Sequence, residues 1–135
     1  MSRNDEYYSF TVLLLLLLLT LLLLPYNSVL KIGLKNNDLS LNSHDILLVE
    51  IVYDWDYTYD GIIIRIYSVT YHSNVTYFNV TIFAFNASIS IIYSNNTLQY
   101  SHGWIDFYEI CNLSVYLIYN SNVYQAIFYN VSLTL

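Results

Sequence analysis

Three aspartates form the densest group of side chains that could do chemistry, and that chemistry would be calcium binding. Asp54, Asp56 and Asp60 lie close together in the chain, and calcium prefers six to eight hard oxygen ligands. The segment departs from a calcium-binding EF-hand loop, because Tyr59 replaces the required glycine and Arg65 replaces the closing glutamate. The aspartates are therefore a weak metal candidate, and the alternative is a solvated turn that ends in Asp60 and a glycine.

The rest of the sequence offers little for catalysis or cofactor binding. His44, His72 and His102 are too far apart for a local metal-ligand pattern, and the sequence contains no nucleophile elbow, phosphate-binding glycine loop or paired cysteines. We therefore predict a protein that is not an enzyme and takes no cofactor. Cys111, the single cysteine, is either a buried small hydrophobic residue or the site of an intermolecular disulfide.

Glycosylation of asparagine is the modification that the sequence favours. Six Asn-x-Ser/Thr sequons occur, whereas fourteen asparagines in a chain with this share of serine and threonine give roughly two by chance. The glycosylation candidates are Asn74, Asn79, Asn86, Asn95, Asn112 and Asn130. The alternative is that composition alone produces the excess.

A leucine run near the N-terminus predicts a membrane segment. Leucine fills residues 13–24 except for Thr20, and tyrosines extend the segment to residues 7–26. About 20 residues at about 1.5 Å each cross a hydrocarbon core of roughly 30 Å. Eleven leucines gain roughly 3 to 6 kcal/mol on insertion. We predict an N-terminal flank of residues 1–6 and a transmembrane signal-anchor helix over residues 7–26.

A cleaved signal peptide is the competing interpretation of this segment. Cleavage after Ser28 would put the bulky Tyr26 where a small residue is preferred, and no alanine lies near the end of the run. Positive charges tend to stay on the cytoplasmic side of a membrane, and here Arg3 and the amino terminus on one flank compete with Lys31 and Lys35 on the other. Charge counting alone mildly favours the C-terminus inside. The sequons require the glycosylating side of the membrane, so we predict the N-terminus inside and the C-terminal domain outside the cell, in a host membrane or a virion envelope.

Charge is unevenly distributed along the chain. The net charge is −6, which disfavours binding to nucleic acid. No Lys, Arg, Asp or Glu occurs between Arg65 and Asp106, and none follows Glu109. Soluble β domains normally protect their sheet edges with charges or prolines. The charge-poor half therefore needs another protection, such as glycans, or it associates with itself or with another surface protein.

The region after the leucine run has the pattern of an all-β domain. Residues 27–45 are predicted to be a stalk or a first strand, and residues 46–135 a β-sandwich ectodomain. The predicted strands are Ile46–Tyr53, Gly61–Tyr71, Val75–Phe85, Ser88–Tyr93, Trp104–Ile110, Asn112–Tyr119 and Val123–Leu135. Seven or eight strands predict an antiparallel sandwich of immunoglobulin-like architecture, although the Cys, Trp, Cys spacing of true immunoglobulin domains is absent.

Alternation along these strands predicts which side chains face outward. The sequon asparagines that fall within strands lie on the more polar side: Asn79, Asn112 and Asn130. In the last strand, Ile127, Val131 and Leu133 are expected to face the core. An outward tyrosine-rich surface that binds sugars or protein is a further hypothesis, although the strand propensity of tyrosine explains most of the sixteen tyrosines.

In composition the chain resembles short membrane proteins of the surface or virion of hyperthermophilic archaea and their viruses. The resemblance rests on the leucine anchor, the abundant isoleucine, tyrosine and asparagine, the single proline and the crowded sequons. It implies a single-pass glycoprotein of uncharacterised type and transfers no functional residue. Thermostable proteins usually enrich Lys and Glu and avoid Asn, and this chain does the opposite; glycosylation would reduce that conflict.

The sequence as a whole predicts a non-enzymatic single-pass membrane protein. Its external sandwich would serve as a surface, adhesion, envelope or coat module that makes contact through an uncharged, tyrosine-rich face. The alternative is a secreted structural subunit with a cleaved signal, which polymerises through uncharged sheet edges, for example with the strand Val123–Leu135.

Overall fold

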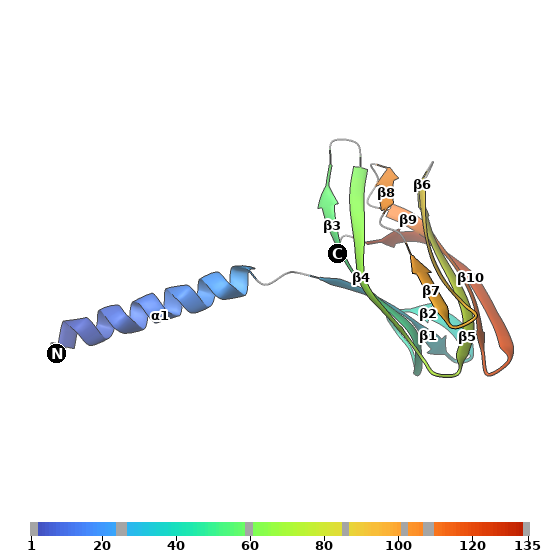
Figure 1. Ribbon diagram of the computed structural model, residues 1–135, viewed down its shortest axis with the longest axis horizontal. Coiled ribbons are helices and arrows are strands. Elements are labelled where there is room, and N and C mark those ends of the chain that lie inside the picture. Colours follow the sequence, from blue (N-terminus) through green and yellow to red (C-terminus); the bar gives the residue numbers. More distant parts are fainter. Residues whose placement is uncertain are drawn as a thin grey trace.

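The described part of the chain forms one helix followed by ten strands in two antiparallel five-stranded sheets (Figure 1). The computed structural model describes residues 3–23, 27–58, 61–84, 87–100, 103–106 and 110–133. Within these ranges the sheets pack face to face as a β-sandwich, with one shared apolar core. The predicted all-β class with an N-terminal apolar helix is therefore confirmed.

The helix α1 spans Arg3–Leu23, about 31 Å at 1.5 Å per residue. It starts before the predicted residue 7, and its first turn carries Asp5 and Glu6, which suit the positive end of the helix dipole. Its side chains from Leu13 to Leu22 contact no core, because its leucines in that range are 47% to 82% exposed. Its length and mean hydropathy of 1.6 suit a membrane span, and a signal sequence would meet the same description.

The two threonines of the helix return their hydroxyl groups to its backbone. Thr11 donates a hydrogen bond to the carbonyl oxygen of Tyr7 at 2.8 Å, and Thr20 donates to that of Leu17 at 2.7 Å. Neither hydroxyl therefore needs water, so both residues are compatible with an apolar surrounding.

The first sheet has the strand order β2-β1-β3-β4-β8. Its strands are β1 (Ser28–Lys35), β2 (Asp38–Leu41), β3 (Ile46–Tyr57), β4 (Gly61–Tyr71) and β8 (Gly103–Asp106). Residues 27–45 therefore supply two paired strands rather than a stalk, and the sandwich begins at Ser28 instead of Ile46. The reason is the alternation of Leu30, Ile32 and Leu34, whose side chains are buried in the core.

The second sheet has the strand order β10-β9-β5-β6-β7. Its strands are β5 (Val75–Ala84), β6 (Ala87–Ser94), β7 (Thr97–Tyr100), β9 (Ile110–Tyr119) and β10 (Asn122–Ser132). β8 and β9 belong to different sheets, whereas the sequence predicted one strand over Trp104–Ile110. These orders differ from the ABED and CFG sheets of immunoglobulin constant domains, so the likeness extends only to the two-layer architecture.

The core is formed by alternate apolar side chains from both sheets. Phe78, Val80 and Ile82 of β5 are buried, as the strand alternation predicted, and face the buried side chains of β1, β3 and β4. An aromatic cluster joins the layers, because the ring of Tyr71 in β4 lies 4.3 Å from that of Tyr93 and 5.7 Å from that of Phe78. Apolar burial at about 25 cal/mol per Å² is the main stabilising contribution of such contacts.

Asparagine forms three of the tight hairpin turns in the described part of the chain. Three two-residue turns have positive φ at both central residues, between 49° and 64°: Asn36-Asn37, Asn95-Asn96 and Asn120-Ser121. Type I′ hairpin turns require positive φ at both positions. Asparagine tolerates this conformation better than other residues with a Cβ, so the high asparagine content has a structural cause in addition to any glycosylation.

The orientation predicted for Ile127 is wrong. The side chain of Ile127 is 51% exposed, whereas Val131 is partly buried and Leu133 is buried. The pairing of β10 with β9 shifts between Phe128 and Val131, where Asn130 has a φ of 56°. This β-bulge inserts a residue and reverses the alternation, so Ile127 faces outward on the same strand that turns Val131 and Leu133 inward.

Gly33 occupies a position that admits no side chain. A Cβ at Gly33 would lie 2.3 Å from the Cβ of His44 and 2.4 Å from the carbonyl oxygen of Ile46. We expect Gly33→Ala to lower the free energy of unfolding by about 1 to 3 kcal/mol, the usual cost of forcing extra atoms into a packed site. Urea unfolding of the full chain in detergent measures this. Ser40→Ala, on the paired strand, is the control, and equal stability of both variants would contradict the close contact.

Candidate functional site

Two of the three aspartates expected to bind calcium, Asp54 and Asp56, lie in a strand rather than in a loop. Asp54 and Asp56 belong to β3 and, being two residues apart, point to the same outer side of the first sheet. Arg65 lies opposite Asp54 on β4. Its Nε donates to Asp54 Oδ1 at 2.9 Å, its second terminal nitrogen donates to Asp54 Oδ2 at 3.2 Å, and the same nitrogen pairs with Asp56.

This arrangement gives the carboxylates a cationic partner from the chain itself. The Tyr67 hydroxyl also donates to Asp54 Oδ2, at 2.8 Å. Hydrogen bonds to Asp56 and Asp54 raise the pKa of Arg65, and the bond to Asp54 raises that of Tyr67. Asp60 lies outside the described residues, and within them no three His, Cys, Asp or Glu side chains come together as a metal site. The calcium candidate therefore has no structural support in this part of the chain.

The sequons gather on the second sheet. Four of the described sites lie on its strands or on their turns, and one directly precedes β5: Asn79, Asn95, Asn112 and Asn130, and Asn74. Asn86 lies outside the described residues. The strands that carry or flank these sites all belong to the second sheet. Sites far apart in the sequence therefore lie on or next to one layer of the sandwich.

None of the described sequon asparagines is fully buried. Asn74, Asn95 and Asn130 are exposed, and Asn79 and Asn112 are half-buried. Asn79 Oδ1 accepts a hydrogen bond from the Thr81 hydroxyl at 3.1 Å, and Asn112 Oδ1 accepts one from the backbone N–H of Asn130 at 3.2 Å. Both hydrogen bonds involve the amide oxygen and not Nδ2, which is the atom to which an N-linked glycan would be attached.

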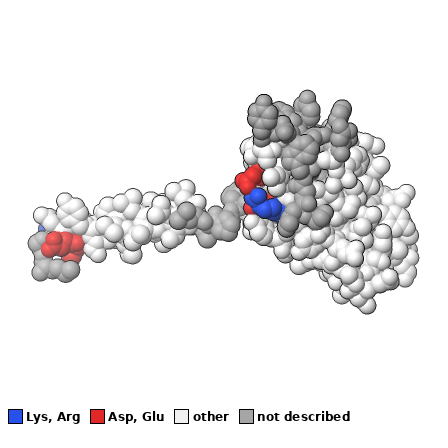
Figure 2. Space-filling model, turned by 45° about the horizontal axis from the view of Figure 1, so that its top comes forward, with Lys and Arg blue, Asp and Glu red and all other residues white. Residues whose placement is uncertain are grey.

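Charge and sequons occupy opposite layers. The five strands of the second sheet contain no Lys, Arg, Asp or Glu. The first sheet and its connections carry the charges of the described part of the sandwich: Lys31, Lys35, Asp38, Asp45, Glu50, Asp54, Asp56, Arg65 and Asp106. In Figure 2 the red and blue atoms of the sandwich gather in one small area of the visible face, and the other described atoms of that face are white.

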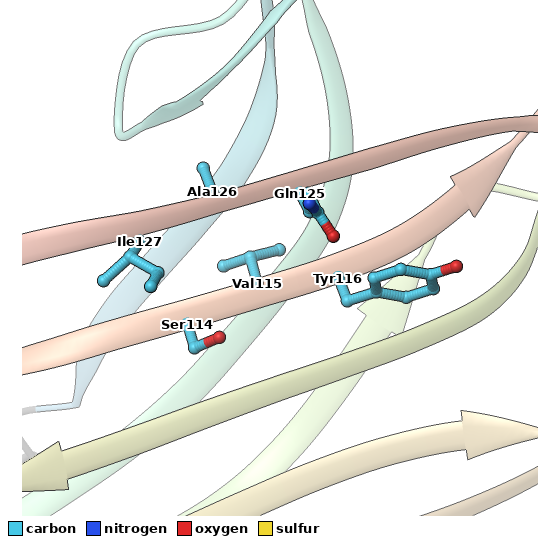
Figure 3. Close-up of a pocket in the computed structure, with 6 residues that line it drawn as sticks. All are labelled: Ser114, Val115, Tyr116, Gln125, Ala126 and Ile127. Carbon is cyan, nitrogen blue, oxygen red and sulfur yellow. The ribbon is translucent and has the colours of Figure 1, made fainter.

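We call the outward side chains of the second sheet the uncharged face. It comprises Tyr77, Asn79 and Thr81 of β5, Ile92 of β6, Ser114 and Tyr116 of β9, and Gln125 and Ile127 of β10. Cross-strand pairing aligns Gln125, Tyr116, Asn79 and Ile92 in one row across four strands. A shallow hollow of about 350 Å³ lies between β9 and β10 and includes Ser114, Tyr116 and Gln125 in its lining (Figure 3).

The edges of the two sheets are unequal in length. β2, β7 and β8 have four residues each, whereas β10 has eleven. β10 contains no charge and no proline, and it exposes Val123, Ile127 and Tyr129 by 56%, 51% and 67%. A long, uncharged edge strand is a ready template for pairing with another chain.

Cys111 lies in the core, as one of the two interpretations of the sequence predicted. Its side chain is buried, and its thiol lies 3.4 Å from the carbonyl oxygen of Val131. Burial raises its pKa to about 11, so the reactive thiolate is rare at neutral pH. A disulfide to another chain would require β10 to separate from β9.

Tyr53 ties the end of β10 to the first sheet. The buried hydroxyl of Tyr53 on β3 donates a hydrogen bond to the carbonyl oxygen of Leu133 at 2.8 Å. Burial, chiefly, raises its pKa to about 12. Exposed tyrosines occur on both sheets. His72 Nδ1 accepts a hydrogen bond from the backbone N–H of Asn74, and its ring lies 5.2 Å from that of Tyr119. His102 lies outside the described residues.

The described residues define a class: a two-layer β-sandwich that follows an apolar N-terminal helix, with the charges in the first sheet and its connections and the sequons on or next to the second sheet. Comparisons with protein-family models, curated proteins and solved structures found no match to this chain. The function therefore has to be inferred from the distribution of these surface features.

Alkaline pH should weaken the sandwich through Tyr53 and Cys111. Both groups have a folded-state pKa above the ordinary value, about 12 and about 11, so the folded protein keeps protons that the unfolded chain releases. The free energy of unfolding should be constant below about pH 8 and fall as the pH rises from about 9 toward 12. Urea unfolding at a series of pH values measures the slope.

The Tyr53→Phe variant separates the two groups. It should lose about 1 to 3 kcal/mol at pH 7, because the Leu133 carbonyl group stays buried without its donor. Its alkaline slope should be shallower than that of the parent protein. Tyr129→Phe, at an exposed position, should change neither quantity, and an unchanged slope in Tyr53→Phe would refute the assignment.

Proposed function

We propose that this protein is a single-pass membrane protein whose sandwich is an N-glycosylated, non-enzymatic module on the outer surface of a cell or an enveloped particle. The observation that carries the proposal is the division of the sandwich into a charged layer and an uncharged layer that bears the sequons. A five-stranded sheet without charged side chains lacks the charges that usually prevent association with other chains in water. Glycans on its surface would protect it.

The proposed orientation in the membrane rests on the same division into a charged layer and an uncharged layer with sequons. Glycosylation of the second sheet requires the C-terminal domain to lie outside the cell, with the N-terminus of α1 inside. The 21-residue helix is long enough for an anchor that crosses a hydrocarbon core of roughly 30 Å, and its leucines from Leu13 to Leu22 are exposed. The bulky Tyr26 before a cut at Ser28 is what favours an uncleaved anchor over a signal peptide. The resemblance in composition to surface and virion proteins of hyperthermophilic archaea and their viruses agrees with this proposal. We also propose that the two-layer sandwich serves recognition at a surface, as immunoglobulin-like domains do.

The activity of such a module would be contact: adhesion, or envelope and coat interactions. The surface left for contact is the charged outer side of the first sheet, where Asp54, Asp56 and Arg65 form an ion-pair network, together with the edge strand β10. The partners would be the lipid bilayer, glycans and either another surface protein or a second copy of this chain.

A secreted subunit that polymerises through sheet edges is the second candidate, and the length of β10 favours it. Donation of the whole strand to a neighbour is disfavoured, because the hydrogen bond from Tyr53 and the burial of Leu133 fix the end of the strand in its own sandwich. Edge-to-edge addition keeps those contacts and uses the unpaired side of β10.

Mass spectrometry of the protein from its native membrane or particle fraction tests the leading proposal. We expect an intact N-terminal leucine segment, release by detergent but not by alkaline carbonate, and added mass on at least one of Asn74, Asn79, Asn95, Asn112 and Asn130. A mature N-terminus near Ser28 would support the secreted subunit instead. An intact anchor with unmodified asparagines would contradict the proposed topology.

A charge on the edge strand tests the polymerisation candidate. Ile127→Lys places an ammonium group in the middle of β10 and should abolish assembly, because edge lysines block strand pairing. Gln99→Lys, on the short opposite edge β7, is the matched control and should leave assembly unchanged. Sedimentation of the secreted protein measures both variants, and a parent protein that stays monomeric at all concentrations excludes this candidate.

A further inference from the structure

Among the described sequons, Asn79 has the most central position. It lies in the middle of β5, and β5 is the middle strand of the second sheet. Its cross-strand partners are Tyr116 on β9 and Ile92 on β6. A group attached to Asn79 would therefore rise from the centre of the uncharged face, with strands on both sides.

Aromatic rings flank this asparagine on the same face. Tyr77 precedes it by two residues, and the ring centroids of Tyr77 and Tyr116 are 5.8 Å apart at an interplanar angle of 79°. In such an edge-to-face pair, the edge of one ring meets the face of the other. Tyr116 is 38% exposed, so its ring has room for a contact from solvent.

The hydrogen bond of Asn79 orients its amide. The Thr81 hydroxyl occupies the amide oxygen, so the amide nitrogen is the atom left for attachment. Attachment uses a lipid-diphosphate-linked saccharide as the donor: Asn79 Nδ2 forms a bond to C1 of the sugar, the bond from C1 to the phosphate oxygen breaks, the lipid diphosphate leaves, and the amide loses one proton.

We propose that the first sugar on Asn79 packs its C–H-rich face against the ring of Tyr116. The electron-rich face of an aromatic ring attracts such C–H groups, and the absence of charge from the sheet suits a neutral saccharide. The glycan thereby covers the centre of the uncharged face and stabilises the fold. This inference rests on the proposed glycosylation and goes beyond it, because it assigns the glycan a structural contact.

A second sequon on the sheet has the same neighbourhood. Asn112, near the start of β9, lies opposite Phe83 on β5, so Asn79 and Asn112 each pair with an aromatic residue of the neighbouring strand. Asn95 differs, because it lies in the β6–β7 turn with a φ of 50° and is exposed. A glycan there would extend into solvent, and the site therefore serves as an internal control.

A double-mutant cycle on the glycosylated full chain tests the contact. Tyr116→Leu keeps an apolar side chain but removes the ring, and Asn79→Gln removes the glycan. We expect Tyr116→Leu to lower Tm by about 4 to 8 °C when Asn79 carries its glycan, and by clearly less in the Asn79→Gln background. Tyr116→Phe keeps the ring and should keep the coupling.

The control removes the glycan from the β6–β7 turn. Thr97→Ala destroys the sequon of Asn95 and removes one long hydrogen bond of the turn, from the Thr97 hydroxyl to the Asn95 carbonyl oxygen at 3.4 Å. The effect of Tyr116→Leu should be the same with or without this substitution. Equal effects of Tyr116→Leu in the presence and absence of the Asn79 glycan would overturn the stacking contact and leave the proposed function intact. Bare asparagines at all sequons by mass spectrometry would overturn both.

Discussion

Contact between the inner faces of the two sheets is the interaction on which the rest of the structure depends. The single cysteine excludes an internal disulfide, and the second sheet has no charged side chain to form an ion pair. Buried apolar residues of β1, β3 and β4 must therefore meet those of β5, β6 and β9. The aromatic cluster of Tyr71, Phe78 and Tyr93 and the hydrogen bond from Tyr53 to Leu133 fix how the layers lie on each other. Both outer surfaces are then free to differ in chemistry.

Asparagine has two roles in this fold, and the structure separates them. Seven of the fourteen asparagines have positive φ within the described residues, where asparagine is the best substitute for glycine. Among the five described sequon sites, only Asn95 and Asn130 belong to that group. Asn74, Asn79 and Asn112 have no such backbone requirement, so turn geometry alone does not account for the sequon excess.

Local patterns in the sequence predicted the apolar helix and most of the long strands, because each depends on alternation or on a continuous apolar run. The four-residue strands β2 and β7 were not predicted, because strands so short show too few alternating residues to be recognised in the sequence. The outward direction of Ile127 depends on a bulge at Asn130 that alternation does not reveal. The pairing of Arg65 with Asp54 depends on the register of β3 and β4, which is set by a further bulge near Val52 and by the whole sheet.

The bulge at Asn130 bears on the choice between the two candidate functions. Asn130 breaks the regular pairing of β10 with β9 close to the C-terminal end of the long edge strand, and bulges of this kind interrupt edge-to-edge addition. A glycan on Asn130, which is exposed, would place a bulky hydrophilic group at that end of the edge. Glycosylation and polymerisation through β10 thus compete for one strand. The arrangement of sequons around an uncharged sheet favours a protected surface module over a subunit that assembles through this edge.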